Sequence, residues 1–317
     1  MNLNNNFLNA LWKSTFFTMI LYFIVCLTWG TTWIGIKIAV ETVPPLLASG
    51  LRFVIAFPFL LIITLLTKAP IFFPKEQRRF FIVLILFYFT IPYYLLSYGE
   101  QYVSSGLTSL LFSTMPIFSI IFSIILLKEK ILLNQIIGIL IGVSCLILIL
   151  SSEGIIISHI GFFGVLAILS AALMHGFLYV YSKKVASNIN IFTFNTLPIG
   201  IAGLLLCIFS FLFEHPNIEK ISTHSWFALL YLGIFASVGG FIVYFYLLKR
   251  MSPIILSFIF IIFPVVAIAI DTSYEHKPIT PTFIFYSIIM LLGFSLTKIP
   301  FNKLFSKNII NKKRKDI

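Results

Sequence analysis

The chain has 317 residues, of which 60% are hydrophobic and 10% charged, and its formal net charge is +12. Soluble domains contain roughly 45–50% apolar and about 25% charged residues, so this chain has too little polar surface to cover a water-soluble globule of its size. This composition excludes a cytosolic enzyme, a disordered scaffold and a secreted disulfide-rich domain, and it leaves a multi-span membrane protein. Cys26, Cys145 and Cys207 lie far apart inside apolar runs, which indicates neither a disulfide nor a metal site.

Ten apolar runs are long enough to cross a bilayer. A helix needs roughly 20 apolar residues to span about 30 Å of hydrocarbon, because every backbone amide must be satisfied within the helix. The N-terminal residues lack the pattern of a cleaved signal peptide, so we expect the first run to be retained as a span. The predicted spans are residues 16–38, 46–66, 80–98, 106–127, 132–150, 162–181, 192–213, 226–248, 253–272 and 282–296.

The distribution of charge predicts the orientation of these spans. With the N-terminus in the cytoplasm, most Lys and Arg residues fall on the cytoplasmic side, as the positive-inside rule requires. We therefore predict an even number of spans with both termini cytoplasmic. The basic tail, with KKRK at 312–315, is expected to contact membrane lipids rather than nucleic acid. The cytoplasmic set outside the tail is Lys13, Lys68, Lys75, Arg78, Arg79, Lys128, Lys130, Lys183, Lys184, Lys249 and Arg250, and the opposite side holds Glu41, Glu100, Glu153, Glu214, Glu219 and Glu275.

The fourth and ninth predicted spans share a sequence pattern. Ser104 precedes Pro116 by twelve residues, and Ser252 precedes Pro264 by twelve. Because the two spans are five apart, an odd number, the two halves of the chain would insert with opposite orientation. An inverted repeat of five plus five spans can expose a site at the bilayer midplane first to one side and then to the other.

Two segments of the first half resemble a known family. LTWGTTWIGIK at 27–37, followed by VPPLLASGLRF at 43–53, is similar to the opening of an EamA-type protein of the drug/metabolite transporter superfamily. GEQYVSSGLTSLLFSTMPIFSIIFSIILLKEK at 99–130 resembles the end of that family's first repeat, with a Ser-Gly-Leu entry, a central Met-Pro and Glu129 in the turn. The resemblance covers essentially the whole chain.

The resemblance implies an all-α membrane protein with ten transmembrane helices in two inverted five-helix EamA repeats, around a central cavity. It also implies export of small metabolites across the inner (cytoplasmic) membrane. The second repeat departs from the pattern, because its register places Lys277 where the first repeat has Glu129, while Glu275 lies two residues earlier. The two repeats and the basic cytoplasmic tail would occupy residues 16–150, 162–297 and 298–317.

Charged residues inside spans are candidates for substrate binding or coupling, since a charge at mid-bilayer costs about 2.5–3.5 kcal/mol. Arg52 lies about 10 Å along the second span. It either faces the cavity, to bind an anionic substrate group or pair with a carboxylate, or anchors the helix with its end near the surface. Asp271 and Glu275 could carry protons if desolvated, or could be hydrated at the helix end. Lys37 is a further coupling candidate, or forms an i,i+4 pair with Glu41.

Aromatic side chains are the second group of candidates for substrate binding. Trp29 and Trp33 are four residues apart and share a helix face, as do Tyr94 and Tyr98. Such faces stack on rings and on cations. They can equally pack between helices or face lipid.

His175 lies in the middle of the sixth span, one turn from Tyr179, and by register corresponds to Trp29 of the first repeat. An imidazole at this depth either relays protons near neutral pH or packs between helices. Prolines inside spans free backbone carbonyls, so they are candidate hinges or simple kinks. These prolines are Pro92, Pro116, Pro198 and Pro264.

The sequence contains no Gly-Lys pair and therefore no Walker loop, and it lacks H-E-x-x-H. We expect no catalytic residues, no metal and no cofactor. We predict a secondary transporter, monomeric or weakly homodimeric, that exports amino acids or similar small amphipathic metabolites by alternating access, with proton coupling left open. Multidrug or organic-cation efflux is the alternative within transport, and a multi-span enzyme acting on lipid-linked substrates is the alternative outside it.

Overall fold

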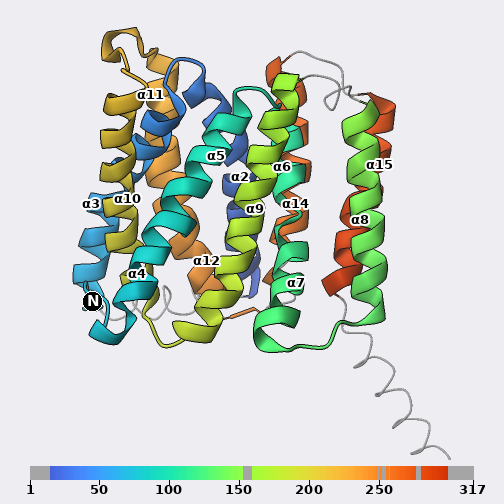
Figure 1. The fold of residues 1–317 in the computed structure, drawn as a ribbon, viewed down its shortest axis with the longest axis horizontal. Coiled ribbons are helices and arrows are strands. Elements are labelled where there is room, and N and C mark those ends of the chain that lie inside the picture. Colours follow the sequence, from blue (N-terminus) through green and yellow to red (C-terminus); the bar gives the residue numbers. More distant parts are fainter. Residues whose placement is uncertain are drawn as a thin grey trace, which may run out of the picture.

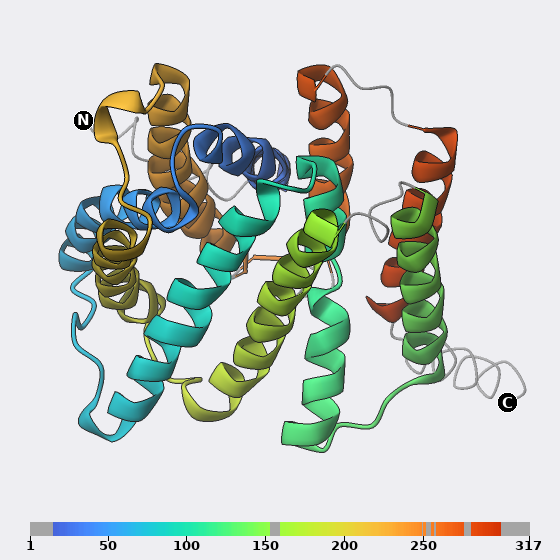
Figure 2. The same cartoon turned by 45° about the horizontal axis from the view of Figure 1, so that its top comes forward.

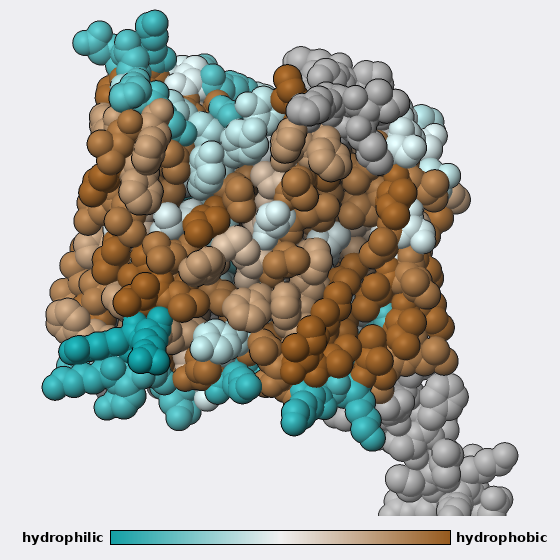
Figure 3. All heavy atoms as spheres, in the orientation of Figure 1, coloured by the Kyte–Doolittle hydropathy of each residue, from teal (hydrophilic) through white to brown (hydrophobic). Residues whose placement is uncertain are grey.

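The computed structural model describes residues 15–152, 159–248, 250–251, 255–256, 258–275 and 280–298, which form a bundle of helices (Figure 1). In this part of the chain, nine helical segments are long and apolar enough to cross a membrane, and a tenth, Ile259–Tyr274, is shorter. Figure 3 shows the consequence at the surface, where an apolar band separates two hydrophilic ends. The predicted all-α membrane fold is confirmed, while the tail beyond residue 298 lies outside the described residues.

The helices follow the predicted spans closely. The first repeat holds α2 (Thr15–Val40), α3 (Pro45–Leu66), η1 (Lys75–Gln77), α4 (Arg78–Leu84), η2 (Ile85–Thr90), α5 (Ile91–Glu100), α6 (Ser105–Phe112), α7 (Met115–Leu127) and α8 (Leu133–Ser152). The second holds α9 (His159–Val185), α10 (Ile191–Phe213), η3 (Ile218–Lys220), α11 (Thr223–Leu230), η4 (Tyr231–Gly239), α12 (Gly240–Leu248), α14 (Ile259–Glu275) and α15 (Pro281–Lys298).

The packing of the helices repeats with inverted symmetry. The first helix of each repeat packs against the fourth span of the other: α2 lies on α14, and α9 lies on α6 and α7. A Cβ atom at Gly30 of α2 would lie 3.1 Å from the Phe263 carbonyl oxygen, and one at Gly176 of α9 would lie 3.0 Å from that of Met115. Matching glycines therefore allow close approach at both crossings.

The second helices, α3 and α10, pack directly against each other. A Cβ at Gly50 would lie 3.1 Å from the Gly203 carbonyl oxygen, and a Cβ at Gly203 would lie 3.2 Å from that of Gly50. The fifth helices, α8 and α15, meet in the same way through Gly138 and Gly293. Figure 2 shows that the α8–α15 pair stands at one side of the other helices.

Several predicted spans differ in their internal structure. The fourth span is two helices, because α6 ends at Phe112 and α7 begins at Met115, directly before Pro116. The third and eighth spans each contain a π-helical segment, η2 and η4, and Pro92 is the second residue of α5, which follows η2. Pro198 and Pro264 lie inside the uninterrupted helices α10 and α14, so the structure shows no helix break at either proline.

Basic and acidic residues gather at opposite ends of the bundle. The basic end holds the connections after α3 and α7, with Lys68 and Lys128, and the last turn of α9, with Lys183 (Figure 1). The acidic end holds the connections after α2, α5 and α10, with Glu41 and Glu214. Charge is therefore segregated as predicted. The assignment of the basic end to the cytoplasm stays a prediction.

Candidate functional site

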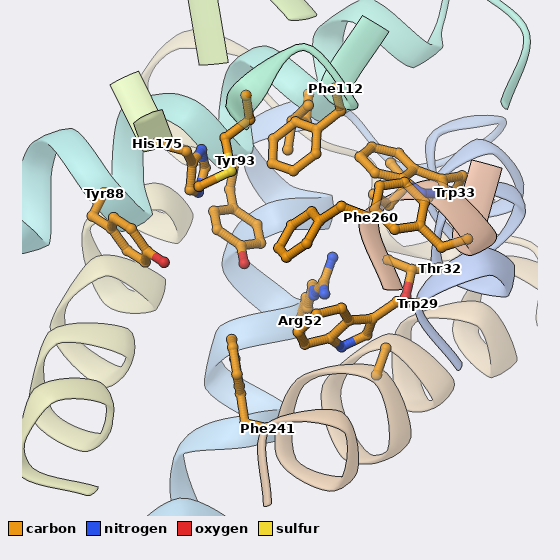
Figure 4. Close-up of a pocket in the computed structure, with 15 residues that line it drawn as sticks. Trp29, Thr32, Trp33, Arg52, Tyr88, Tyr93, Phe112, His175, Phe241 and Phe260 are labelled. Atoms are coloured by element: carbon orange, nitrogen blue, oxygen red, sulfur yellow. The ribbon is translucent and has the colours of Figure 1, made fainter. Parts of the chain in front are cut away.

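A cavity of about 140 Å³ lies at the interface of the two repeats (Figure 4). All the spans except the second of the second repeat and the fifth of each repeat contribute to its lining. From the first repeat it is lined by Trp29, Thr32, Trp33, Ile36, Arg52, Tyr88, Tyr93, Leu96, Phe112 and Met115, and from the second by His175, Ala236, Phe241, Phe260 and Phe263.

A larger cavity of about 430 Å³ leads from this site toward the basic end. It reaches Tyr179, Lys183 and Ser187 near the end of α9, and Lys298 at the end of α15. Because several side chains line both cavities, the two spaces adjoin. The shared residues are Trp29, Tyr88, Met115, Phe241 and Phe260.

Arg52 is the buried charge of the central cavity. It is 6% exposed, its Nε donates a hydrogen bond to Ser237 Oγ at 3.0 Å, and its guanidinium carbon lies 5.2 Å from the centroid of the Tyr93 ring. Figure 4 shows the guanidinium among Tyr93, Phe260 and Trp29. A cation over a ring face is attracted by the ring quadrupole. Of the two expected environments, the structure gives Arg52 the cavity-facing one.

Aromatic rings make up most of the cavity wall. The Trp29 ring centroid lies 5.0 Å from that of Tyr244 and 6.1 Å from that of Phe260. Trp33 stacks on Phe263 at 5.8 Å and contacts Phe112 at 5.2 Å. These are the separations at which aromatic pairs attract one another. The two tryptophans thus form a continuous apolar wall with the fourth spans of both repeats.

His175 is 5% exposed and lies against the rings of Tyr88 and Tyr93, at 4.8 and 5.7 Å between centroids. Its Nδ1 lies 2.9 Å from the Ala171 carbonyl oxygen. Because a carbonyl oxygen can only accept, Nδ1 carries the proton of this hydrogen bond. His175 precedes Gly176 as Trp29 precedes Gly30, so the glycine packing places the two side chains at corresponding positions of the repeats.

The structure brings together four of the seven predicted substrate-binding residues. Trp29, Trp33, Arg52 and His175 line the central cavity, and Tyr179 lines only the larger one. Tyr94 and Tyr98 line neither cavity among the described residues. Their rings contact each other and Tyr102, at 6.1 and 5.2 Å between centroids.

The tyrosines in the cavity are Tyr88 and Tyr93, which sequence reasoning missed. They are five residues apart, a spacing that an ordinary α-helix turns to different faces. The π-helical segment η2 (Ile85–Thr90) bonds each residue to one five positions away, so it brings both rings to the same side. Thr90 Oγ1 donates to the Ile85 carbonyl oxygen at 2.8 Å within this wide turn.

The coupling candidates lie nearer the acidic end. Lys37 Nζ donates to the backbone carbonyl oxygens of Glu100 and Val103, at 2.8 and 3.2 Å. Glu41, its expected partner, accepts a hydrogen bond from Tyr274 at 2.7 Å. Glu100 lies at the acidic end, as the sequence predicted, but its side chain is fully buried. The signal that could have found it is the GEQ segment itself, where a charge directly follows an apolar span.

Asp271 is 9% exposed, so of the two expected environments the structure gives it the buried one rather than that of a hydrated helix end. Its Oδ1 accepts a hydrogen bond from Ser105 Oγ at 2.6 Å, and its Oδ2 lies 2.9 Å from where a Cβ at Gly106 would be. The carboxylate therefore joins α14 of one repeat to the start of α6 in the other. The side chain of Glu275 lies outside the described residues. Within the described part of the chain, no group of three His, Cys, Asp or Glu side chains could hold a metal ion.

Comparison with known proteins identifies the family. The model of the EamA-like transporter family matches residues 16–151 and 162–299. The chain is 43% identical over 292 residues to an uncharacterized transporter of Buchnera aphidicola subsp. Schizaphis graminum (92% of this chain, 97% of that protein) and 40% identical over 283 residues to Protein PagO of Salmonella typhimurium (89% and 93%).

More distant relatives extend the match. The uncharacterized transporter YoaV of Bacillus subtilis is 31% identical over 280 residues, which cover 88% of this chain and 96% of that protein. A solved crystal structure, 16% identical, superposes with a TM-score of 0.66 over 89% of this chain and 96% of its own, which shows the same fold. Two matched repeats and these full-length relatives establish that the chain is a membrane transporter and belongs to the EamA-like transporter family.

Proposed function

We propose that this protein is a secondary transporter that exports small amphipathic organic compounds, such as amino acids, across the cytoplasmic membrane by alternating access. The observation that carries the proposal is the cavity at the interface of the inverted repeats, with Arg52 buried among aromatic rings. Inverted repeats supply two related conformations that expose one site to opposite sides. The protein acts as a monomer or weak homodimer surrounded by lipid.

The two ends of the cavity support access from the cytoplasm in this conformation. Toward the basic end the larger cavity continues to Lys183 and Lys298, and the positive-inside rule places that end in the cytoplasm. Toward the acidic end, α2 and α5 are joined by the hydrogen bonds of Lys37, and α14 and α6 by that of Asp271. Export requires these contacts to separate, with Pro92 and Pro116 beside the helix breaks as hinges.

Asp271 is the carboxylate through which we propose proton coupling. It is buried between α14 and α6, where its hydrogen bond from Ser105 depends on the two helices being together. Separation of these helices would break this hydrogen bond and hydrate the carboxylate, so we assign proton exchange to this conformational change. Lys37 and Glu275 are the further coupling candidates, and Pro198 and Pro264 the remaining hinge candidates.

The test is release from proteoliposomes loaded with a mixture of standard amino acids and aromatic carboxylic acids, followed by mass spectrometry. With an imposed pH gradient, we expect one or a few compounds to leave the liposomes. A protonophore should stop the accumulation of these compounds outside. Asp271→Asn should lower gradient-driven release by about tenfold or more while counterflow exchange, which needs no net proton movement, continues. Ser105→Ala, which keeps the carboxylate, is the matched control and should retain gradient-driven release.

The outcomes separate the parts of the proposal. Release that depends on neither the pH gradient nor the protonophore would contradict proton coupling but not transport. Thermal unfolding checks that the protein in the liposomes is folded. If it is folded and no compound is released, the proposed function itself is contradicted.

A further inference from the structure

The described residues that line the two cavities carry positive charge and no carboxylate. Arg52 lies in the central cavity, and Lys183 and Lys298 lie along the larger one. No Asp or Glu stands among the lining residues of either cavity in the described part of the chain. At the exposed rim, Glu129 pairs with Lys183 at 3.4 Å, with both side chains more than half exposed. A solute that moves along this route therefore meets cations and rings.

Arg52 has hydrogen-bonding capacity that the described residues do not fill. Its Nε binds Ser237, but its two Nη groups make no hydrogen bond to the described residues, and no carboxylate oxygen among them lies within 4.0 Å. The Glu100 carboxylate acts on this charge only from a longer distance. A guanidinium presents its donors as a planar fork that matches the two oxygens of a carboxylate.

The burial of Arg52 excludes the alternative in which its end escapes to the surface. The side chain is 6% exposed and lines the cavity among Trp29, Tyr93 and Phe260. A buried cation is strongly disfavoured unless an anion joins it. The same charge repels a cationic solute from the cavity, so the lining disfavours organic-cation efflux.

We infer that the substrate carries a single carboxylate, which binds the free side of the Arg52 guanidinium, and an apolar, ring-bearing body that packs on Trp29, Trp33 and Phe260. Among the described lining residues of the central cavity, Arg52 is the one Lys, Arg, Asp or Glu side chain, and a single guanidinium matches one negative charge rather than a phosphate dianion. An amino group on the substrate finds no carboxylate partner among the lining residues, so it is tolerated but not required. This inference rests on the proposed transport function and names its substrate class.

Four related phenylalkyl compounds test the inference: 3-phenylpropionate, phenylalanine, 3-phenylpropanamide and phenethylamine. Their binding to the full chain in lipid nanodiscs is measured by calorimetry. We expect the two carboxylates to bind at least about tenfold more tightly than the neutral amide, and the amine to bind most weakly. Arg52→Gln should remove the preference for 3-phenylpropionate over its amide, and Arg52→Lys should keep part of it.

Arg79→Gln is the matched control, since it removes the same charge from an exposed position outside both cavities, and it should keep the full preference. If Arg52→Gln does not fold, the order of the four ligands on the unaltered protein still decides. Equal binding of acid and amide, tighter binding of the amine, or no binding of either carboxylate would each overturn the inference.

Transport measured with the same panel keeps the two proposals apart. If the carboxylates bind but do not cross a liposome membrane, the proposed transport function is contradicted and the inferred binding site stands. If the amide or the amine is transported as fast as the acid, the proposed transport function stands and the inferred need for a carboxylate is overturned.

Discussion

The two repeats have the same packing and different chemistry. Gly30 and Gly176 occupy corresponding crossings, yet the residue before each is Trp29 in one repeat and His175 in the other. Gly50 and Gly203 contact each other, and two residues later the first repeat has Arg52 where the second has Leu205. The symmetry therefore belongs to the helix contacts, which permit two related conformations. The asymmetry belongs to the cavity, where the buried charge comes from the first repeat alone among the described lining residues.

The largest expected effect comes from disrupting the glycine contact between α3 and α10, to which both repeats contribute. In Gly50→Ala, the added methyl group would lie 2.9 Å from the Cys207 backbone nitrogen and 3.1 Å from the Gly203 carbonyl oxygen, and neither backbone atom can move without its helix. Overpacking of this kind costs about 1–3 kcal/mol. We expect a clearly lower midpoint of thermal unfolding in detergent, together with loss of transport.

Gly239→Ala is the control for this prediction. The nearest atom to its added methyl group is the Ile234 carbonyl oxygen at 3.6 Å, an ordinary contact. The substitution should leave unfolding unchanged or raise its midpoint slightly, since Ala favours helix over Gly. Equal unfolding midpoints for Gly50→Ala and the unaltered protein would show that the α3–α10 contact can accommodate an added methyl group.

The starts of α3 and α10, the second helices of the two repeats, are capped differently. We expect substitutions of the two caps to change the stability of the protein by a smaller amount. Glu214, which follows α10, accepts hydrogen bonds from the Leu46 and Leu47 backbone nitrogens at the start of α3, at 2.9 and 3.3 Å, and from Ser210 at 2.6 Å. The start of α10 is capped within its own repeat, by Asn190 Oδ1 at 2.9 Å from the Phe192 nitrogen. The first cap crosses between repeats, and the second does not.

We expect Glu214→Ala to destabilise the protein by about 1–2 kcal/mol and Asn190→Ala by about 1 kcal/mol or less, because the first change also removes a charge that favours the helix N-terminus. Thermal unfolding of the two variants side by side measures the difference. Destabilisation of the same size in both variants would show that the bond between repeats adds nothing to an ordinary cap.

Much of the fold could be predicted because a bilayer leaves few choices. The apolar length of each span and the basic connections were sufficient for the helices and their sidedness. The matched Ser104–Pro116 and Ser252–Pro264 spacings only hinted at a repeat, and the resemblance to EamA-type proteins implied the inverted arrangement. Pro116 marked the fourth span as a candidate hinge, but the position of the break after Phe112 could not be predicted, since Ser113 and Thr114 are compatible with a continuous helix.

The site could be predicted only where ordinary helix periodicity applies. Trp29 and Trp33 share a face at a spacing of four, and Arg52 is conspicuous as a charge within an apolar run. Tyr88 and Tyr93 were missed because their common face depends on a π-helical turn, which leaves no clear mark in the sequence. Ser237 was missed because its importance comes from its position opposite Arg52, which is set by tertiary packing.

The smallest expected effect concerns His175, the counterpart of Trp29. Its Nδ1 proton is held by the carbonyl oxygen of its own helix, and its ring is enclosed by aromatic rings, so we expect it to act by packing rather than by relaying protons. His175→Phe should therefore keep protonophore-sensitive transport within about twofold of the unaltered protein. Trp29→Ala removes part of the wall of the same cavity, so it should weaken ligand binding by about tenfold. Transport assays in proteoliposomes compare the variants directly. If His175→Phe still exchanges substrate but no longer responds to the pH gradient, the imidazole is the proton carrier, and the corresponding positions of the two repeats divide coupling and binding between them.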